Sequence, residues 1–168
     1  MEKNKKQEKG LNKVLFLGEI GPNGWEEDFV ATSAQCDKIA ERFEIPKVHD
    51  LSAHVVAQWD GDLIRVFGHI KAILRRICVV SLEQFDENLD TDFEALFSEN
   101  VPVLKDGAME DDIDPIDRGR LDIFDIVSEQ IGLNMSSFPR KPGVSGDYME
   151  DDKGSHPFAN LKNLIKKD

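Results

Sequence analysis

The chain has 168 residues, of which 40% are hydrophobic and 32% are charged, and its formal net charge is −12. This size fits one domain with tails, and the acidic balance argues against a simple nucleic-acid binder, because such domains draw affinity from a surplus of Lys and Arg. No apolar run is long enough to span a membrane, no secretory signal is apparent, and two cysteines are too few for a disulfide framework, so we expect a cytoplasmic protein.

The distribution of polar and apolar residues predicts the domain organisation. Residues 1–10 are polar and of mixed charge, which is typical of a flexible tail. We expect a single α+β domain over residues 11–139, with an acidic loop near residues 105–118. An acidic linker over residues 140–155 then leads to a short C-terminal amphipathic helix over residues 156–167. The predicted architecture is a mostly antiparallel, curved sheet with helices packed against one side.

A first helix is predicted after Thr32 or Ser33, either of which can cap it. Its apolar stripe consists of Cys36, Ile39, Ala40 and Phe43, and Pro46 lies beyond its end. The acidic residues before this helix, Glu26 to Asp28, are interpreted as a polar lead-in.

Two runs of alternating polarity, residues 51–59 and 62–75, flank Asp60-Gly61, which is a strong hairpin signal. A two-residue loop at this place gives three cross-strand pairs: Gln58 with Leu63, Val56 with Arg65 and His54 with Phe67. The predicted core face then holds Ala53, Val55, Ala57, Ile64, Val66, Gly68, Ile70, Ala72 and Leu74.

The opposite face of the second run alternates basic, aromatic and aliphatic side chains. It presents Arg65, Phe67, His69, Lys71, Ile73 and Arg75. An exposed sheet with such side chains can hold single-stranded RNA by stacking and charge. The alternative is an ordinary solvated face, or one covered by a helix or by the C-terminal segment.

The region after Cys78 is expected to supply one or two further strands with one buried face. Apolar residues and one threonine share a parity there: Phe85, Leu89, Thr91, Phe93, Ala95 and Phe97. Negative charges crowd the same region: Glu83, Asp86, Glu87, Asp90, Asp92 and Glu94. We interpret these charges as solvated edge-strand charges that discourage aggregation.

Two more helices are predicted toward the C-terminus. Asp122 stands where a cap belongs for the first, whose apolar side holds Ile123, Val127 and Ile131. The final helix starts near Pro157, with Phe158, Leu161 and Ile165 on one side and Lys162, Lys166 and Lys167 toward its end. So short a helix is marginal in isolation, so we expect it to dock on its own domain or on a partner.

Patterns for catalysis or for metal and cofactor binding are poor, and we expect no catalytic, cofactor-binding or metal-binding residues. No histidine pair has helical spacing with an acid between its members. Cys78 has Ser81 where a Cys-x-x-Cys zinc site would need a second cysteine, so we expect no bound zinc. Both Cys36 and Cys78 are best explained as small buried hydrophobes.

Four short motifs in order resemble the YceD family, bacterial and plastid proteins linked to accumulation of large-subunit ribosomal RNA. They are a strand from Gly68 leading to Cys78-Val79-Val80-Ser81-Leu82-Glu83, then Leu121-Asp122-Ile123 through Glu129, Phe138-Pro139-Arg140, and Pro157-Phe158-Ala159. The form with Val80 and Ser81 matches the family branch that has Cys-Val-Val-Ser/Thr-Leu-Glu, and departs from the Cys-x-Arg-Cys-Leu form. The positions matched are Gly68, Cys78, Leu82, Asp122, Glu129, Pro139, Pro157 and Phe158.

The resemblance implies a non-catalytic factor that supports large-subunit ribosomal RNA accumulation and ribosome biogenesis, with no cofactor, membrane or small-molecule substrate. Its implied partners are ribosomal RNA, a large-subunit ribosomal protein or an RNA-processing enzyme. In one mechanism RNA contacts the sheet face and the final helix, through Arg65, Phe67, His69, Lys71, Arg75, Lys162 and Lys166. In the alternative, the chain is an acidic adaptor that binds a basic ribosomal protein or RNA-processing enzyme without touching RNA. A cysteine- or metal-dependent enzyme is the least supported class.

Overall fold

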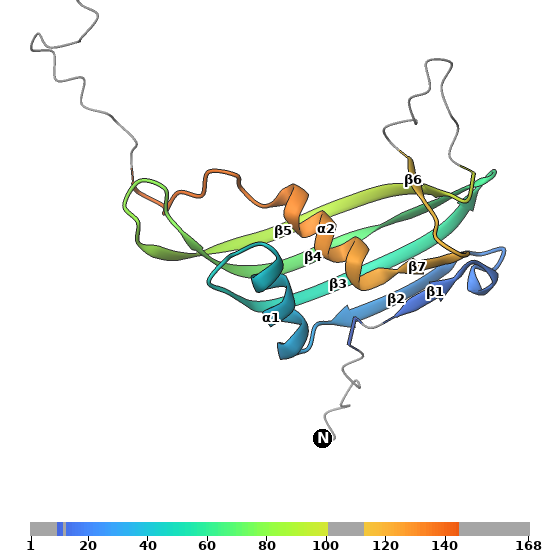
Figure 1. Ribbon diagram of the computed structural model, residues 1–168, viewed down its shortest axis with the longest axis horizontal. Helices are drawn as coiled ribbons and strands as arrows, with labels where there is room; N and C mark the ends of the chain where they lie inside the picture. The colour runs from blue at the N-terminus through green and yellow to red at the C-terminus, as the bar shows by residue number, and fades with distance from the viewer. Residues whose placement is uncertain (1–9, 12, 101–112, 145–168) are drawn as a thin grey trace, which may run out of the picture.

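The computed structural model describes residues 10–11, 13–100 and 113–144, and it confirms an α+β fold with a mostly antiparallel, curved sheet (Figure 1). The elements in chain order are β1 (Val14–Phe16), the 3-10 turn η1 (Leu17–Glu19), β2 (Trp25–Val30), α1 (Ser33–Arg42), β3 (Lys47–Asp60), β4 (Leu63–Ile77), β5 (Gln84–Ser98), β6 (Ile113–Pro115), β7 (Arg120–Asp122) and α2 (Ile123–Asn134). The predicted tail, the C-terminal helix and most of the acidic linker lie outside the described residues.

Strands β2 to β6 form one five-stranded sheet in sequence order. Its neighbours are antiparallel except β5 and β6, which are parallel and pair only over Leu96 to Ser98 of β5. A separate antiparallel pair joins β1 to β7, with Leu15 opposite Leu121. The sheet is thus a meander of three long central strands with short strands at its margins.

The two helices and the β1–β7 pair cover one face of the large sheet, which we call the inner face (Figure 1). Its core combines apolar side chains from all of these elements: Leu15, Ile39, Val55, Val66, Ile70, Leu121, Ile123, Val127 and Ile131 are all buried. The opposite, outer face has no helix or strand over it within the described part of the chain. Burial of one face only is what the period-two pattern predicted.

The register of the β3–β4 hairpin differs from the expected one. Asp60 pairs with Leu63, so Gly61 and Asp62 form the loop, and His54 lies opposite His69 instead of Phe67. Gly61 has a φ of +65°, whereas no positive φ occurs at Asp62, which matches a type II′ turn with glycine first and not the type I′ turn assumed from Asp60-Gly61. The shift is an even number of residues, so the predicted core face is unchanged.

Two segments expected to be irregular are strands. Residues 26–28, interpreted as a polar lead-in, lie in the middle of β2, where Phe29 is buried against the core. Ile113 to Pro115, within the expected acidic loop, form β6 beside β5. The first part of that expected loop, residues 105–112, lies outside the described residues.

The backbone of β3 lies very close to β4 at Gly68. A Cβ atom at this position would lie 1.9 Å from the carbonyl oxygen of His54 and 3.2 Å from the ring of Phe93. No side chain fits there, because real Cβ atoms do not approach backbone atoms so closely. A residue without a side chain therefore lets two long strands coil around each other at the centre of the sheet.

We predict that Gly68→Ala destabilises the protein by about 3 kcal/mol, because the clash with backbone outweighs the roughly 0.5–1 kcal/mol that alanine ordinarily gains over glycine. Urea denaturation of the purified variant measures the change. Gly18→Ala is the matched control, since an added Cβ at Gly18 meets nothing within 4 Å. Equal stability of the two variants would contradict the close approach.

Candidate functional site

The side chains proposed as contacts on the sheet lie in one row on the outer face of β4. Arg65, Phe67, His69, Lys71 and Arg75 occupy alternate positions of this strand, as their parity predicted. The Arg65 guanidinium lies over the Phe67 ring, 5.0 Å from its centroid, which is the geometry of a cation–π contact. Lys162 and Lys166, the other proposed contacts, lie outside the described residues.

Each cation of this row faces a carboxylate of β5. Arg75 binds Asp86 through two nitrogens, with N–O distances of 2.5 and 3.1 Å. The Lys71 ammonium lies 3.3 Å from Asp90, and the Arg65 guanidinium lies 3.9 Å from Glu94. Hydrogen bonds from Arg75 and Lys71 lower the pKa values of Asp86 and Asp90 respectively. The basic row is therefore largely neutralised by its own neighbouring strand.

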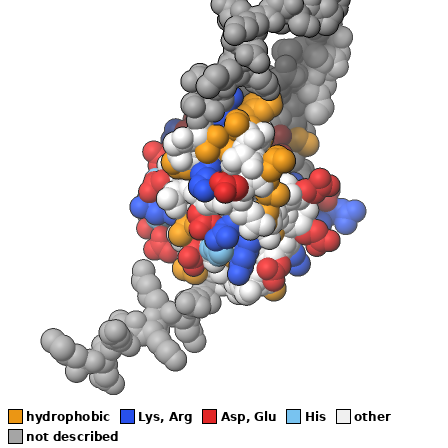
Figure 2. All heavy atoms as spheres, turned by 90° about the vertical axis from the view of Figure 1, so that its left-hand side faces the viewer, with side chains coloured by type: hydrophobic (Ala, Val, Ile, Leu, Met, Phe, Trp, Pro, Cys, Tyr) orange, Lys and Arg blue, Asp and Glu red, His pale blue; other side chains and the backbone are white. Residues whose placement is uncertain are grey.

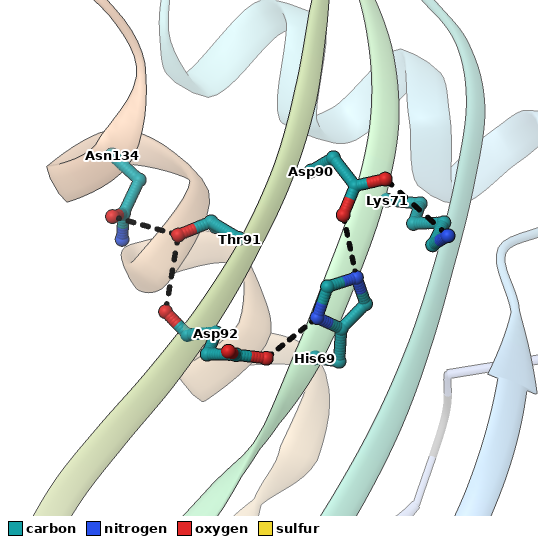
Figure 3. Close-up of polar contacts among 6 residues, drawn as sticks. All are labelled: His69, Lys71, Asp90, Thr91, Asp92 and Asn134. Atoms are coloured by element: carbon teal, nitrogen blue, oxygen red, sulfur yellow. Dashed lines mark hydrogen bonds and ion pairs between the residues drawn. The ribbon is translucent and has the colours of Figure 1, made fainter.

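His69 is held between two carboxylates (Figure 3). Its Nε2 lies 2.7 Å from Asp90 and its Nδ1 lies 2.6 Å from Asp92. Both ring nitrogens can donate at once only in the imidazolium form, and the hydrogen bond to Asp92 is the main cause that raises the pKa of His69. The Thr91 hydroxyl, 3.1 Å from the Asp92 carbonyl oxygen and 3.3 Å from the Asn134 side-chain oxygen, links this cluster to α2.

The outer face as a whole is acidic. Its strands present eight carboxylates: Glu26, Asp28, Asp50, Asp60, Asp86, Asp90, Asp92 and Glu94. Among the described residues of these strands, four Lys or Arg side chains share the face, namely Lys47, Arg65, Lys71 and Arg75. His54, which contacts Asp28 at 2.9 Å, and His69 border a shallow hollow at its centre, beside Phe67 and Gly68. The face thus offers negative charge around a partly apolar centre.

Cys78 begins the loop that joins β4 to β5. Its thiol is buried and accepts a hydrogen bond from the Ser81 amide at 3.4 Å. The Ser81 hydroxyl and the amides of Ser81, Lys141 and Val80 all favour the thiolate, and together they lower the pKa of Cys78 to about 6. Ser81, which stands where a Cys-x-x-Cys pattern would have its second cysteine, therefore donates hydrogen bonds to the Cys78 sulfur.

The segment after α2 packs against this loop. The Val79 amide donates to the Pro139 carbonyl oxygen at 2.9 Å, and the Lys141 ammonium lies 2.9 Å from Glu83. Nearby, the buried Arg76 binds Glu87 and the Ser136 carbonyl oxygen, each at 2.8 Å. These hydrogen bonds and ion pairs hold residues 136–141 against the end of the β4–β5 hairpin.

The matched family positions fall in separate places. Cys78, Leu82 and Pro139 come together at the end of the β4–β5 hairpin, whereas Gly68 lies in the middle of β4. Asp122 caps α2 by accepting from the amides of Phe124 and Asp125, and Glu129 is exposed on that helix. Pro157 and Phe158 lie outside the described residues. The described positions have structural roles or lie on the surface, and they do not form one catalytic centre.

The described residues have neither a cluster of metal ligands nor a membrane-spanning helix. Among the described residues, no group of three or more His, Cys, Asp or Glu side chains is placed to hold a metal ion. The helices within those residues are too short or too polar to cross a membrane.

Sequence reasoning missed the partners of the singled-out residues. The signal for the β5 pairing was present, since Asp86, Asp90, Asp92 and Glu94 share a parity that places them opposite the basic row. Of the donors to Cys78, Ser81 and Val80 follow it closely in sequence, whereas the Lys141 amide gave no sequence signal because it is distant along the chain.

Comparison with known proteins gives one match. The family model described as "Large ribosomal RNA subunit accumulation protein YceD" matches residues 66–165, which is more than half of the chain. The matched span includes β4, β5, the Cys78 loop and α2. No curated protein and no solved structure matches the chain.

We predict that the Cys78 thiol ionises with a midpoint near pH 6. The ultraviolet absorbance of the thiolate, recorded during a pH titration, measures this midpoint. The transition should vanish in Cys78→Ala and persist in Cys36→Ala, because burial raises the pKa of Cys36. Ser81→Ala should move the midpoint toward the ordinary thiol value of about 8.5. A wild-type midpoint already at that value would contradict the donor arrangement.

We also predict that His69 stabilises the fold most in its protonated form. Its pKa is raised in the folded state, so its contribution is complete below the unfolded value of about 6.5 and is lost as pH rises through the folded value. The stability gap between wild type and His69→Gln in urea should therefore shrink from mildly acidic to alkaline pH. In NMR titrations, Asp92→Asn should lower the pKa of His69; an unchanged value would exclude Asp92 as the cause.

Proposed function

Since the chain belongs to the YceD family of large ribosomal RNA subunit accumulation proteins, we propose that it supports large-subunit ribosomal RNA accumulation during ribosome biogenesis without catalysis. In this proposal it is a cytoplasmic adaptor that binds a basic protein, either a large-subunit ribosomal protein or an RNA-processing enzyme. The acidic outer face of the sheet is the observation that carries this mechanism.

The charge balance of the outer face favours a basic protein over RNA. Phosphate approaching Arg65, Lys71 or Arg75 would have to replace the β5 carboxylates that already hold these cations. It would also meet the remaining carboxylates of the face, and like charges disfavour such an approach. Lys and Arg side chains of a partner would instead meet an excess of carboxylates, which raises the rate of association.

Binding of a basic, RNA-binding partner would also explain how the acidic face affects the amount of large-subunit RNA. Proteins that bind RNA carry a surplus of Lys and Arg, and these cations bind phosphate without sequence preference. An acidic surface can occupy them until the intended RNA competes for them. We propose that this protection, and not contact with the RNA, is what raises the amount of large-subunit RNA.

A non-catalytic role agrees with the surroundings of Cys78. A nucleophilic cysteine needs an accessible sulfur and a positioned base. The Cys78 sulfur is buried, and its pKa is lowered by the Ser81 hydroxyl and by backbone amides, none of which is a base. These donors suit a structural thiolate at the start of the loop.

We predict that deleting the gene lowers large-subunit RNA more than small-subunit RNA, and that the wild-type chain restores the ratio. The variant Asp92→Asn/Glu94→Gln should restore it less well, because it removes two exposed carboxylates beside the central hollow. Measuring both RNAs in complemented strains tests family role and mechanism together. An unchanged ratio on deletion would remove the family role.

Two further variants separate the mechanisms. Asp37→Asn/Glu41→Gln makes the same change in net charge on α1, away from the outer face, and should behave as wild type. Arg65→Gln/Lys71→Gln removes cations from the β4 row, where the Phe67 ring could stack on a base. If only this last variant fails, direct RNA contact replaces the adaptor mechanism.

A further inference from the structure

The end of the β4–β5 hairpin exposes a cluster of large apolar side chains, which we call the hairpin tip. It consists of Ile77, Val79, Val80, Leu82 and Phe138, whose exposed fractions run from 44% for Val80 to 76% for Leu82. The hydrogen bond from Val79 to Pro139 brings the two segments together. Figure 2 views the molecule from this end, where apolar side chains gather on the surface. An exposed apolar cluster of this kind marks a contact surface.

The backbone at Leu82 supports a contact at the hairpin tip. Leu82 has a φ of +60°, in the left-handed region that a branched side chain rarely adopts. The strain presents the leucine side chain to solvent, where it gains no burial. Strained positions that persist in this way are typical of sites that bind something.

The charges around the hairpin tip have the opposite sign to those of the whole chain. Three carboxylates lie near it, and each is held by a cation: Glu83 by Lys141, Asp86 by Arg75 and Glu87 by Arg76. Lys47, which pairs with Arg75 across the strands, and Arg140, which follows Pro139, have no ion-pair partner among the described residues. The tip therefore combines apolar surface with uncompensated positive charge, in a chain of net charge −12.

The sequence that follows the described part of the chain has the complementary character. It contains the acidic run Asp147, Glu150, Asp151 and Asp152, followed by the apolar residues Phe158, Leu161 and Ile165. We propose that this C-terminal segment covers the hairpin tip of its own chain. Its carboxylates lie toward Lys47 and Arg140, and its apolar residues lie on Leu82 and Phe138.

The position of the segment in the chain favours its own tip over a partner. The chain passes Pro139 at the tip only shortly before Val144, where the described part ends. The residues between Val144 and Phe158 can extend over about 45 Å, which is ample to return to the tip. A short tether of this kind gives the segment an effective concentration of about 1 mM at the hairpin tip. The family match over residues 66–165 includes both tip and segment.

Photo-cross-linking in the full chain tests the proposal. The cross-linker p-benzoylphenylalanine replaces Phe158, or Leu161 in a second protein, and adducts are mapped by mass spectrometry. We expect an adduct of monomer mass that joins the cross-linker to residues 77–82 or to Phe138. An adduct of dimer mass, an adduct to any other surface or no adduct in either protein would overturn the proposal.

Matched variants test the role of the apolar cluster. Leu82→Ser/Phe138→Ser should lower the adduct yield by about tenfold or more, because a tenfold change needs no more than the burial energy of one such side chain. Leu133→Ser is the control, since Leu133 on α2 is 73% exposed, close to the 76% of Leu82. Equal yields in wild type and the double variant would overturn the proposal, whereas the RNA ratio of the deletion strain tests the proposed function separately.

Discussion

The uninterrupted pairing of β4 with β5, from Ile64 to Ile77, is the constraint on which most of the structure depends. Because side chains alternate along both strands, one register decides both faces of the sheet at once. It places Ile70 and Leu74 over the core, and it sets Asp90 and Asp92 beside His69 on the outer face. It also fixes where the strands end, and so where the Cys78 loop and residues 136–141 meet.

This arrangement separates charge within one small domain. The outer face is acidic at its centre, since carboxylates outnumber cations there, while the hairpin tip has apolar side chains and, beside them, Lys47 and Arg140 without an ion-pair partner in the described part of the chain. The net charge of −12 hides this polarity, because it sums over both regions and over segments outside the described residues. One small domain thus presents two surfaces of opposite character.

The features that follow from local periodicity could be predicted from the sequence. Alternation identified the core face of β3 and β4, and capping residues located α1 and α2, where Thr32 and Asp122 accept amide hydrogen bonds as expected. The predicted hairpin register was wrong because the register depends on the turn type. Gly61 can be the second residue of a type I′ loop with Asp60 or the first residue of a type II′ loop with Asp62, and the structure has the second arrangement. β2 was missed because Glu26, Glu27 and Asp28 obscure the alternation of Trp25 with Phe29. The donors to Cys78 divide in the same way: Ser81 and Val80 are close in sequence, whereas the Lys141 amide is brought close only by the tertiary fold and could not be predicted.

The pairing of β1 with β7 has a consequence for the order of folding. Leu15 lies opposite Leu121, so the first described strand finds its neighbour only when the last described strand has been made. During synthesis the meander of β2 to β5 can assemble while β1 is still unpaired, because β7 has not yet been made. Contacts so distant in sequence slow folding, because a long loop must close before they form. Closure of the core beneath α2 is therefore a late step, and a nascent chain interrupted before Leu121 leaves Leu15 without its opposite strand.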